Sequence, residues 1–190
     1  MILNGKIRTI MFCMTMGITS AIASIDNNAT ASLLHPSSID LPEQSRIKTI
    51  DILNTALANM TNLALATKNA HWNVKGMQFI SLHKLFDEIY NELVQEIDTV
   101  AERITALAGT ALGTLQETQK GTTIGSYPST IFSGKEHLQT LSGMTAVVGA
   151  MLRENIQRCS DLGDWDSADV FTELSRKFDK RLWFLQAHLQ

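Results

Sequence analysis

The sequence contains few of the residues that cross-link or interrupt a chain. Among its 190 residues there are two cysteines (Cys13 and Cys159) and three prolines, and aromatic residues make up 6%. Two cysteines argue against a disulfide-rich scaffold and against a thiolate metal site. We expect Cys159, which lies on an apolar helical stripe, to be a buried free thiol. A composition so low in proline and aromatic residues favours one helical domain over a β-sandwich or barrel.

Positive charge is also scarce. The chain has 16 basic and 19 acidic residues, for a net charge of -3, and residues 24–45 contain neither lysine nor arginine. Nucleic-acid binding gains mainly from basic residues that release counterions. The overall charge therefore gives no indication of a nucleic-acid-binding protein.

The first 23 residues have the parts of a secretory signal peptide. Lys6 and Arg8 precede an uncharged run at 9–19, and the small-x-small sequence Ala-Ile-Ala ends at Ala23. The run is too short to span a bilayer comfortably. We therefore predict cleavage after Ala23 and a periplasmic or secreted mature protein without membrane association. The alternative is a cytosolic extension on a cytoplasmic, nucleoid-associated protein.

The mature chain would be more acidic than the full one. Removal of residues 1–23 deletes two basic residues and no acidic ones, which leaves 14 basic against 19 acidic residues and a net charge of -5. Residues 24–45 are polar and hold two of the prolines, so they predict a flexible N-terminal tail before the folded domain at 46–190.

Four long segments have helical periodicity. They cover about 46–73, 79–107, 138–159 and 171–189, and the second has the clearest apolar stripe, ending before Gly109 and Gly113. Glycines and Pro128 interrupt the connection at 114–133, which contains one short candidate helix at TLQET. Four helices with short first and third links and a long second link predict an all-α, ferritin-like four-helix bundle with a crossover between helices 2 and 3.

Candidate metal ligands follow the apolar stripe of the second helix. His83 and Asp87 are four residues apart, as are Asp98 and Glu102. Eleven residues separate Asp87 from Asp98, or three turns plus about 20°, so all four lie on one stripe. His71 lies at the end of the preceding helix. Two imidazoles and three carboxylates suit iron, with zinc or manganese as alternatives. The alternative without a metal is an ordinary solvated flank of the helix.

One ion cannot reach all five of these residues in one straight helix, because Asp87 and Asp98 are roughly 16 Å apart along the axis. One solution is a second copy of the chain packed antiparallel across a two-fold axis, which would create two shared sites per dimer. A di-iron centre inside one bundle would use Glu-x-x-His motifs, and the sequence contains none.

Several motifs resemble the Dps family of ferritin-like mini-ferritins. They are HWNVKG at 71–76, LH at 82–83, D-x-x-AER at 98–103, ALGT at 111–114 and SRKFDKRLWFL at 175–185. The resemblance covers about residues 45–190. It implies a hollow dodecamer built from two-fold dimers, in which His71, His83 and Asp87 of one subunit face Asp98 and Glu102 of its partner.

The resemblance also implies an activity. Each shared site would be a ferroxidase centre that holds two irons and oxidises Fe(II) to Fe(III), with hydrogen peroxide preferred over dioxygen. The ferric product would be stored as mineral inside the shell, which would protect the cell against oxidative damage.

Two further features have a structural and a functional interpretation each. Trp72 is either an aromatic plug between helices or an oxidisable residue that intercepts radicals near the irons. The acidic run at 161–169 either caps a helix or, as the resemblance implies, lines a pore that admits Fe(II). Its candidate pore residues are Asp164, Asp166 and Asp169.

The alternative function is a DNA-compacting Dps shell in which iron chemistry is secondary. The tail at 24–45 lacks the basic residues for this role, which makes DNA binding doubtful. The remaining candidate patch is formed by Lys177, Lys180 and Arg181, with a solvated helix face as the alternative. We expect His35, His137 and His188 to be surface residues, and Trp183 and Phe184 to serve in packing.

Overall fold

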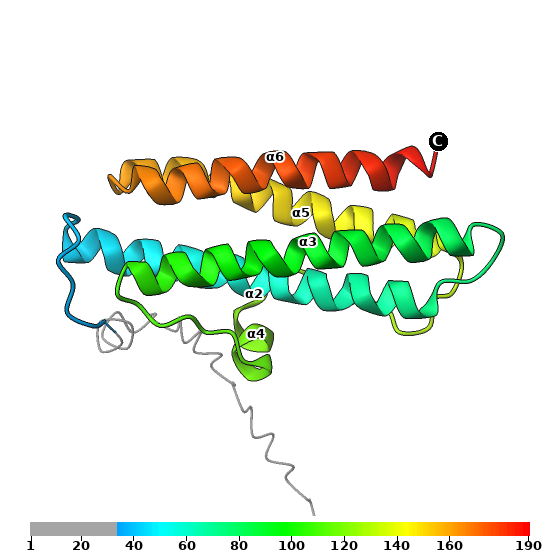
Figure 1. The fold of residues 1–190 in the computed structure, drawn as a ribbon, viewed down its shortest axis with the longest axis horizontal. Coiled ribbons are helices and arrows are strands. Elements are labelled where there is room, and N and C mark those ends of the chain that lie inside the picture. The colour runs from blue at the N-terminus through cyan, green and yellow to red at the C-terminus, as the bar shows by residue number, and fades with distance from the viewer. Residues whose placement is uncertain (1–33) are drawn as a thin grey trace, which may run out of the picture.

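The computed structural model describes residues 34–190, which form four long helices and one short helix (Figure 1). The long helices are α2 (Glu43–Asn73), α3 (Phe79–Ala106), α5 (Gly134–Asp161) and α6 (Trp165–Ala187). The short helix α4 (Leu115–Gly121) lies in the long connection between α3 and α5. The four predicted helices and the crossover are therefore confirmed.

The signal-like segment lies outside the described residues. So do Cys13, the Ala23 cleavage site and residues 24–33 of the tail at 24–45. Export, the compartment and the true N-terminus stay predictions. Within the described part of the chain, none of the helices is long and apolar enough to cross a membrane.

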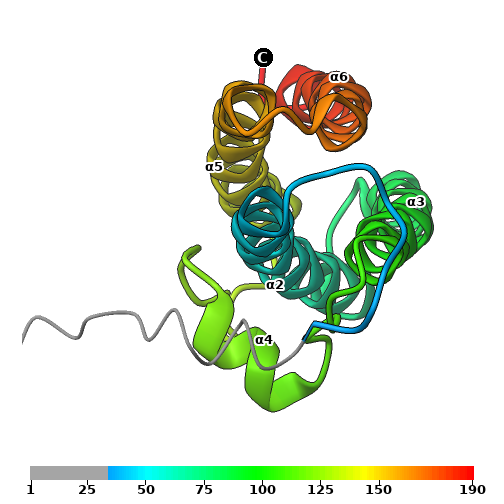
Figure 2. The same ribbon diagram turned by 90° about the vertical axis from the view of Figure 1, so that its left-hand side faces the viewer.

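The bundle consists of two helical hairpins. α2 packs against α3, α5 packs against α6, and α2 also contacts α5. The end-on view shows the four long helices around a common centre, with α4 outside it beside α2 (Figure 2). The buried Asn59 of α2 holds the crossover, because its Oδ1 accepts hydrogen bonds from the backbone N–H groups of Thr123 at 2.7 Å and Ile124 at 3.3 Å.

The core follows the apolar periods of the sequence. Most residues of the predicted α3 stripe are buried, and Phe86 packs in the same cluster as Phe171 and Phe178 of α6. Cys159 is fully buried as expected, and burial raises the pKa of its thiol to about 12. The stripe differs from the prediction at its start, where Phe79 is exposed because it stands in the first turn of α3 at the end of the bundle.

Side-chain caps begin α5 and α6 four and six residues before the predicted periodic segments at 138–159 and 171–189. Ser133 and Glu136 form a capping box at the start of α5, and Asp164 caps α6 by accepting a hydrogen bond from the backbone N–H of Ser167. Gly76 turns the chain between α2 and α3 at φ +108°, a backbone conformation that glycine adopts without strain. This turn determines where His71 lies relative to α3.

The expectation that His137 lies on the surface was wrong. Its side chain is fully buried, because Tyr127 from the crossover covers it and its Nδ1 is hydrogen-bonded to the Tyr127 hydroxyl. Burial lowers the pKa of His137 and raises that of Tyr127. His35 and His188 are exposed, as expected. Trp183 is 64% exposed and its ring lies beside that of Phe184, with the centroids 5.0 Å apart, so within its own chain it packs only at the surface.

Candidate metal centre

The end of α2 and the start of α3 bring three of the predicted ligands together. The rings of His71 and His83 stack with their centroids 3.7 Å apart. Nδ1 of His71 lies 3.9 Å from a carboxylate oxygen of Asp87. The three side chains come from two helices, and the short turn at Gly76 allows them to meet.

The hydrogen bonds of the two imidazoles are reciprocal. Nδ1 of His71 lies 2.7 Å from the backbone carbonyl oxygen of His83, and Nδ1 of His83 lies 2.8 Å from that of His71. A carbonyl oxygen can only accept, so each Nδ1 carries the hydrogen and donates it. In the neutral imidazoles, Nε2 then holds a free lone pair, which is the arrangement that metal-ligating histidines use.

Asp87 already has a cationic partner. Nζ of Lys68 lies 2.5 Å from Oδ1 of Asp87, in an ion pair whose side chains are 22% and 40% exposed. The hydrogen bond from Lys68 is the main cause of a lowered pKa of Asp87, so this carboxylate is ionised at neutral pH. The sequence interpretation missed Lys68. Its signal was the spacing, because Lys68 stands one helical turn before His71.

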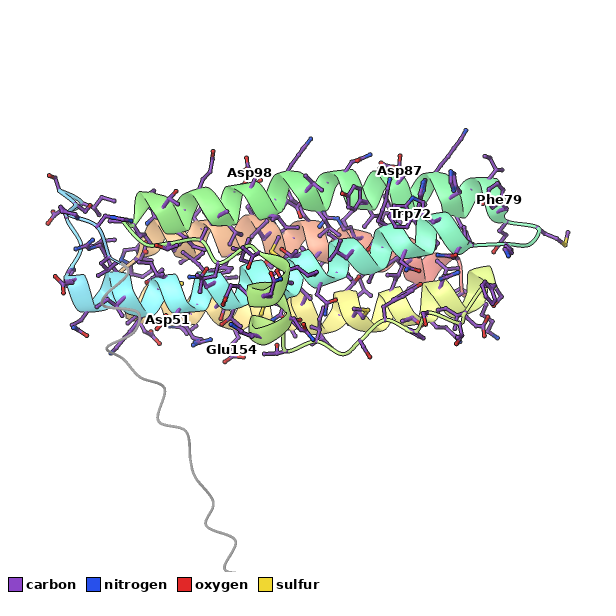
Figure 3. All side chains as sticks on the ribbon, turned by 90° about the horizontal axis from the view of Figure 1, so that it is seen from below. Asp51, Trp72, Phe79, Asp87, Asp98 and Glu154 are labelled. Atoms are coloured by element: carbon purple, nitrogen blue, oxygen red, sulfur yellow. The ribbon has the colours of Figure 1, made fainter. Side chains whose placement is uncertain are left out.

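Asp98 and Glu102 lie in the other half of α3. Both are exposed, and Figure 3 shows Asp98 and Asp87 well apart along the helix. Among residues 34–190 of one chain, no group of three or more His, Cys, Asp or Glu side chains is placed to hold a metal ion. The structure thus brings three predicted ligands together and leaves the other two apart. The ligand role of all five stays a prediction.

Trp72 and the acidic run at 161–169 each had a structural and a functional interpretation, and the structure distinguishes between these for some of the residues. Trp72 is 68% exposed, so it is not a plug between helices of its own chain. Asp164 is buried, accepts from the Ser167 backbone N–H at 3.0 Å and pairs with Arg103 at 2.7 Å, so it has the capping role. Asp166 and Asp169 are exposed and remain candidate pore residues.

The candidate basic patch near the C-terminus loses one of its three members in the structure, while Lys177 and Lys180 are exposed. Arg181 is 3% exposed and forms ion pairs with Glu92 and Glu96 of α3. Lys177 pairs with Glu173 at 2.6 Å, one turn earlier on α6. These neighbours neutralise two of the three positive charges that the sequence alone had placed at the surface, and Lys180 lies over the Phe184 ring.

Known proteins agree with this architecture. A family model described as a ferritin-like domain matches residues 50–190. The DNA protection during starvation protein of Agrobacterium fabrum is 44% identical over 156 residues, covering 82% of this chain and 96% of the relative.

Solved structures agree as well. A DPS protein from Vibrio cholerae O1, described as a member of a broad superfamily of ferritin-like diiron-carboxylate proteins, has a TM-score of 0.77 at 27% identity and covers 81% of this chain and 96% of its own. DpsC from Streptomyces coelicolor has a TM-score of 0.80 at 27% identity and covers 83% and 92%.

These similarities define the class first: the chain has the fold of a ferritin-like protein, with the long crossover between its second and third long helices. Within that class, the chain belongs to the Dps family. Membership supports iron handling and storage and a role in stress protection as the general function.

Proposed function

We propose that the protein is a ferroxidase and iron store that oxidises Fe(II) with hydrogen peroxide, or dioxygen, at sites shared between two subunits. The observation that carries the proposal is the division of the ligands along α3. A pair of histidines with free Nε2 atoms and the Asp87 carboxylate lie near its start, and two exposed carboxylates lie in its other half.

The surface around these residues supports a two-fold contact. Ile80, Asp87 and Val94 follow one another at intervals of seven, so they share one face of α3. Ile80 and Val94 are exposed, as are Leu65 and Trp72 of α2. Exposed apolar side chains gathered on one face indicate a protein contact. An antiparallel partner on this face would bring its Asp98 and Glu102 toward His71, His83 and Asp87, and a dodecamer would hold six such dimers.

The ligand chemistry suits the reaction. Neutral imidazoles bind Fe(II) through Nε2, and carboxylates favour the harder Fe(III) product. Two bound ions supply two electrons, so two Fe(II), one hydrogen peroxide and two protons give two Fe(III) and two water molecules. Because the electrons leave as a pair, no hydroxyl radical is released. The ferric ions then mineralise inside the shell.

A mixed assembly of two inactive variants tests the shared site. We would combine His83→Ala/Asp87→Ala subunits with Asp98→Ala/Glu102→Ala subunits by unfolding and refolding them together. Each mixed dimer then has one site with all its ligands and one with none of the four. Half of randomly formed dimers are mixed, so about a quarter of the wild-type rate of peroxide-driven oxidation should return.

The refolded parents serve as controls and should each lack fast oxidation. Wild-type rates in either parent would contradict the ligand assignment. A mixture as inactive as its parents, with assembly shown by size-exclusion chromatography, would place the site within one chain and contradict the two-fold arrangement.

The name of the Agrobacterium fabrum relative makes DNA protection the second candidate. Protection by direct binding requires basic residues that contact phosphates, whereas Arg181 and Lys177 are engaged in ion pairs. A gel-shift titration of the assembled protein at low salt separates the two functions, because retardation that disappears as salt is added would favour the DNA-binding shell. N-terminal sequencing of fractionated cells would test cleavage after Ala23 and the compartment.

A further inference from the structure

Lys68 lies between two groups of α3 that can each hold a cation. Its Nζ is 2.5 Å from Oδ1 of Asp87 and 4.7 Å from the centre of the Tyr90 ring. Asp87 and Tyr90 are three residues apart and therefore neighbours on the helix surface. The ammonium group already lies over the ring at cation–π distance, so a small movement of its flexible side chain can release the carboxylate and keep the ring contact.

We propose that Lys68 competes with the metal for Asp87. Its ammonium group is shared between Asp87 and the Tyr90 ring in the metal-free protein and is held by the ring alone when Asp87 binds iron. This inference rests on the proposed function. It assigns to Lys68 and Tyr90 a role that the ligand set alone does not contain.

The competition follows from geometry. Oδ1 of Asp87 is in direct contact with Nζ of Lys68, so a metal ion that binds this carboxylate competes with the ammonium group for its negative charge. A monovalent and a divalent cation a few ångströms apart also repel each other. Lys68 is 22% exposed, so solvent screens this repulsion only in part. In the metal-free site, the Lys68 ammonium group balances the charge of the Asp87 carboxylate. A metal ion that binds Asp87 therefore has to displace Lys68.

Tyr90 lowers the cost of that displacement. Without the ring, the displaced ammonium group would have only water as a partner. It would also lie beside a site to which the metal has added positive charge. A cation over a tyrosine ring is held by the negative face of the ring. Loss of the ring should therefore weaken metal binding only while Lys68 is present.

Zinc binding to the assembled full chain tests the idea without any oxidation step. Isothermal titration with Zn²⁺ would compare the wild type with Lys68→Met, which keeps the length of the side chain and removes its charge. We expect about three- to tenfold tighter binding by Lys68→Met. Lys84→Met, a charge removal at an exposed position of α3, is the matched control and should bind as the wild type does.

A double-mutant cycle tests the role of the ring. Tyr90→Leu should bind Zn²⁺ about two- to fivefold more weakly than the wild type, and Tyr90→Phe, which keeps an aromatic face, should not. In the Lys68→Met background, Tyr90→Leu should have no further effect. An effect of equal size in both backgrounds would show that Tyr90 acts only through packing, and would overturn the receiving role.

The His71→Ala/His83→Ala variant identifies the zinc that belongs to this site. If the wild type binds zinc there and Lys68→Met binds it no more tightly, the competitor role is overturned while the proposed metal centre stands. If the wild type and the histidine variant bind alike, the metal centre itself fails, and the inference fails with it. Tighter binding by Lys68→Met alone, with an unchanged Lys84→Met control, supports the inference.

Discussion

Loss of Arg181 should destabilise the bundle more than loss of any surface ion pair. Arg181 reaches from α6 to α3, where Nη1 donates to Glu96 at 2.7 Å and Nη2 donates to Glu92 at 3.0 Å. The side chains of Arg181 and Glu96 are 3% and 5% exposed, whereas that of Glu92 is 45% exposed. The buried pair with Glu96 should therefore contribute more to the stability of the bundle than the exposed pair with Glu92.

The size of the loss in unfolding free energy follows from the buried carboxylate that is left when Arg181 is removed. In Arg181→Leu, the Glu96 carboxylate stays buried with only the ammonium group of Lys177 nearby, at 3.9 Å. Removal of one partner of a buried pair costs about 3–5 kcal/mol, and Lys177 offsets part of it, so we expect a loss of about 3 kcal/mol. In Arg181→Leu/Glu96→Leu no buried charge remains, and most of the loss should be recovered. Glu92→Gln should cost less than about 1 kcal/mol.

Thermal and urea unfolding would measure these differences, with all variants at one protein concentration because assembly contributes to stability. Circular dichroism reports the helices, and size-exclusion chromatography establishes that each variant assembles alike. The reasoning would be refuted if Arg181→Leu lost less than about 1 kcal/mol, or if the double variant were as unstable as the single one.

Three further predictions concern other parts of the fold. Asp164→Ala should cost about 2–3 kcal/mol in urea unfolding, because it removes a helix cap and leaves the Arg103 guanidinium without its 2.7 Å partner. Gly134→Ala should cost about 1–3 kcal/mol in the same assay, since a Cβ would stand 2.5 Å from Cδ1 of the fully buried Leu82. The lowered pKa of His137 means that the unfolded chain binds its proton more readily than the folded chain does. Stability should therefore fall as the pH drops below about 6.5, and less so in His137→Asn, as measured by melting temperature between pH 7 and 5.

The helices were predictable because local patterns determine them. The stripe containing Leu82, Phe86 and Leu93 is buried as its period indicated, and α2 and α3 end at or within one residue of the predicted positions. The proximity of His71 and His83 also followed from the sequence, since a short turn joins two adjacent helices. These features depend on contacts between near neighbours along the chain.

The errors arose where distant segments meet. His137 is buried because Tyr127, in the irregular crossover, covers it, and no periodic pattern indicates where such a segment packs. Arg181 belongs to a basic run in the sequence, yet its partners stand 85 and 89 residues away on α3. The formal charge of a segment therefore overestimates the positive surface that a folded helix presents.

The proposed metal centre connects these local features to assembly. In a single chain, one half of the centre consists of two histidines beside a carboxylate that Lys68 already neutralises. This half should hold Fe(II) weakly, because its carboxylate is occupied and the carboxylates of the other half stand too far along α3. Fe(II) that met peroxide one ion at a time would supply single electrons and release radicals. A site that gains two further carboxylates only at the two-fold contact would also gain there the negative charge to displace Lys68. Such a site would confine oxidation to the assembled shell, where two electrons leave together and the ferric product has a cavity to enter.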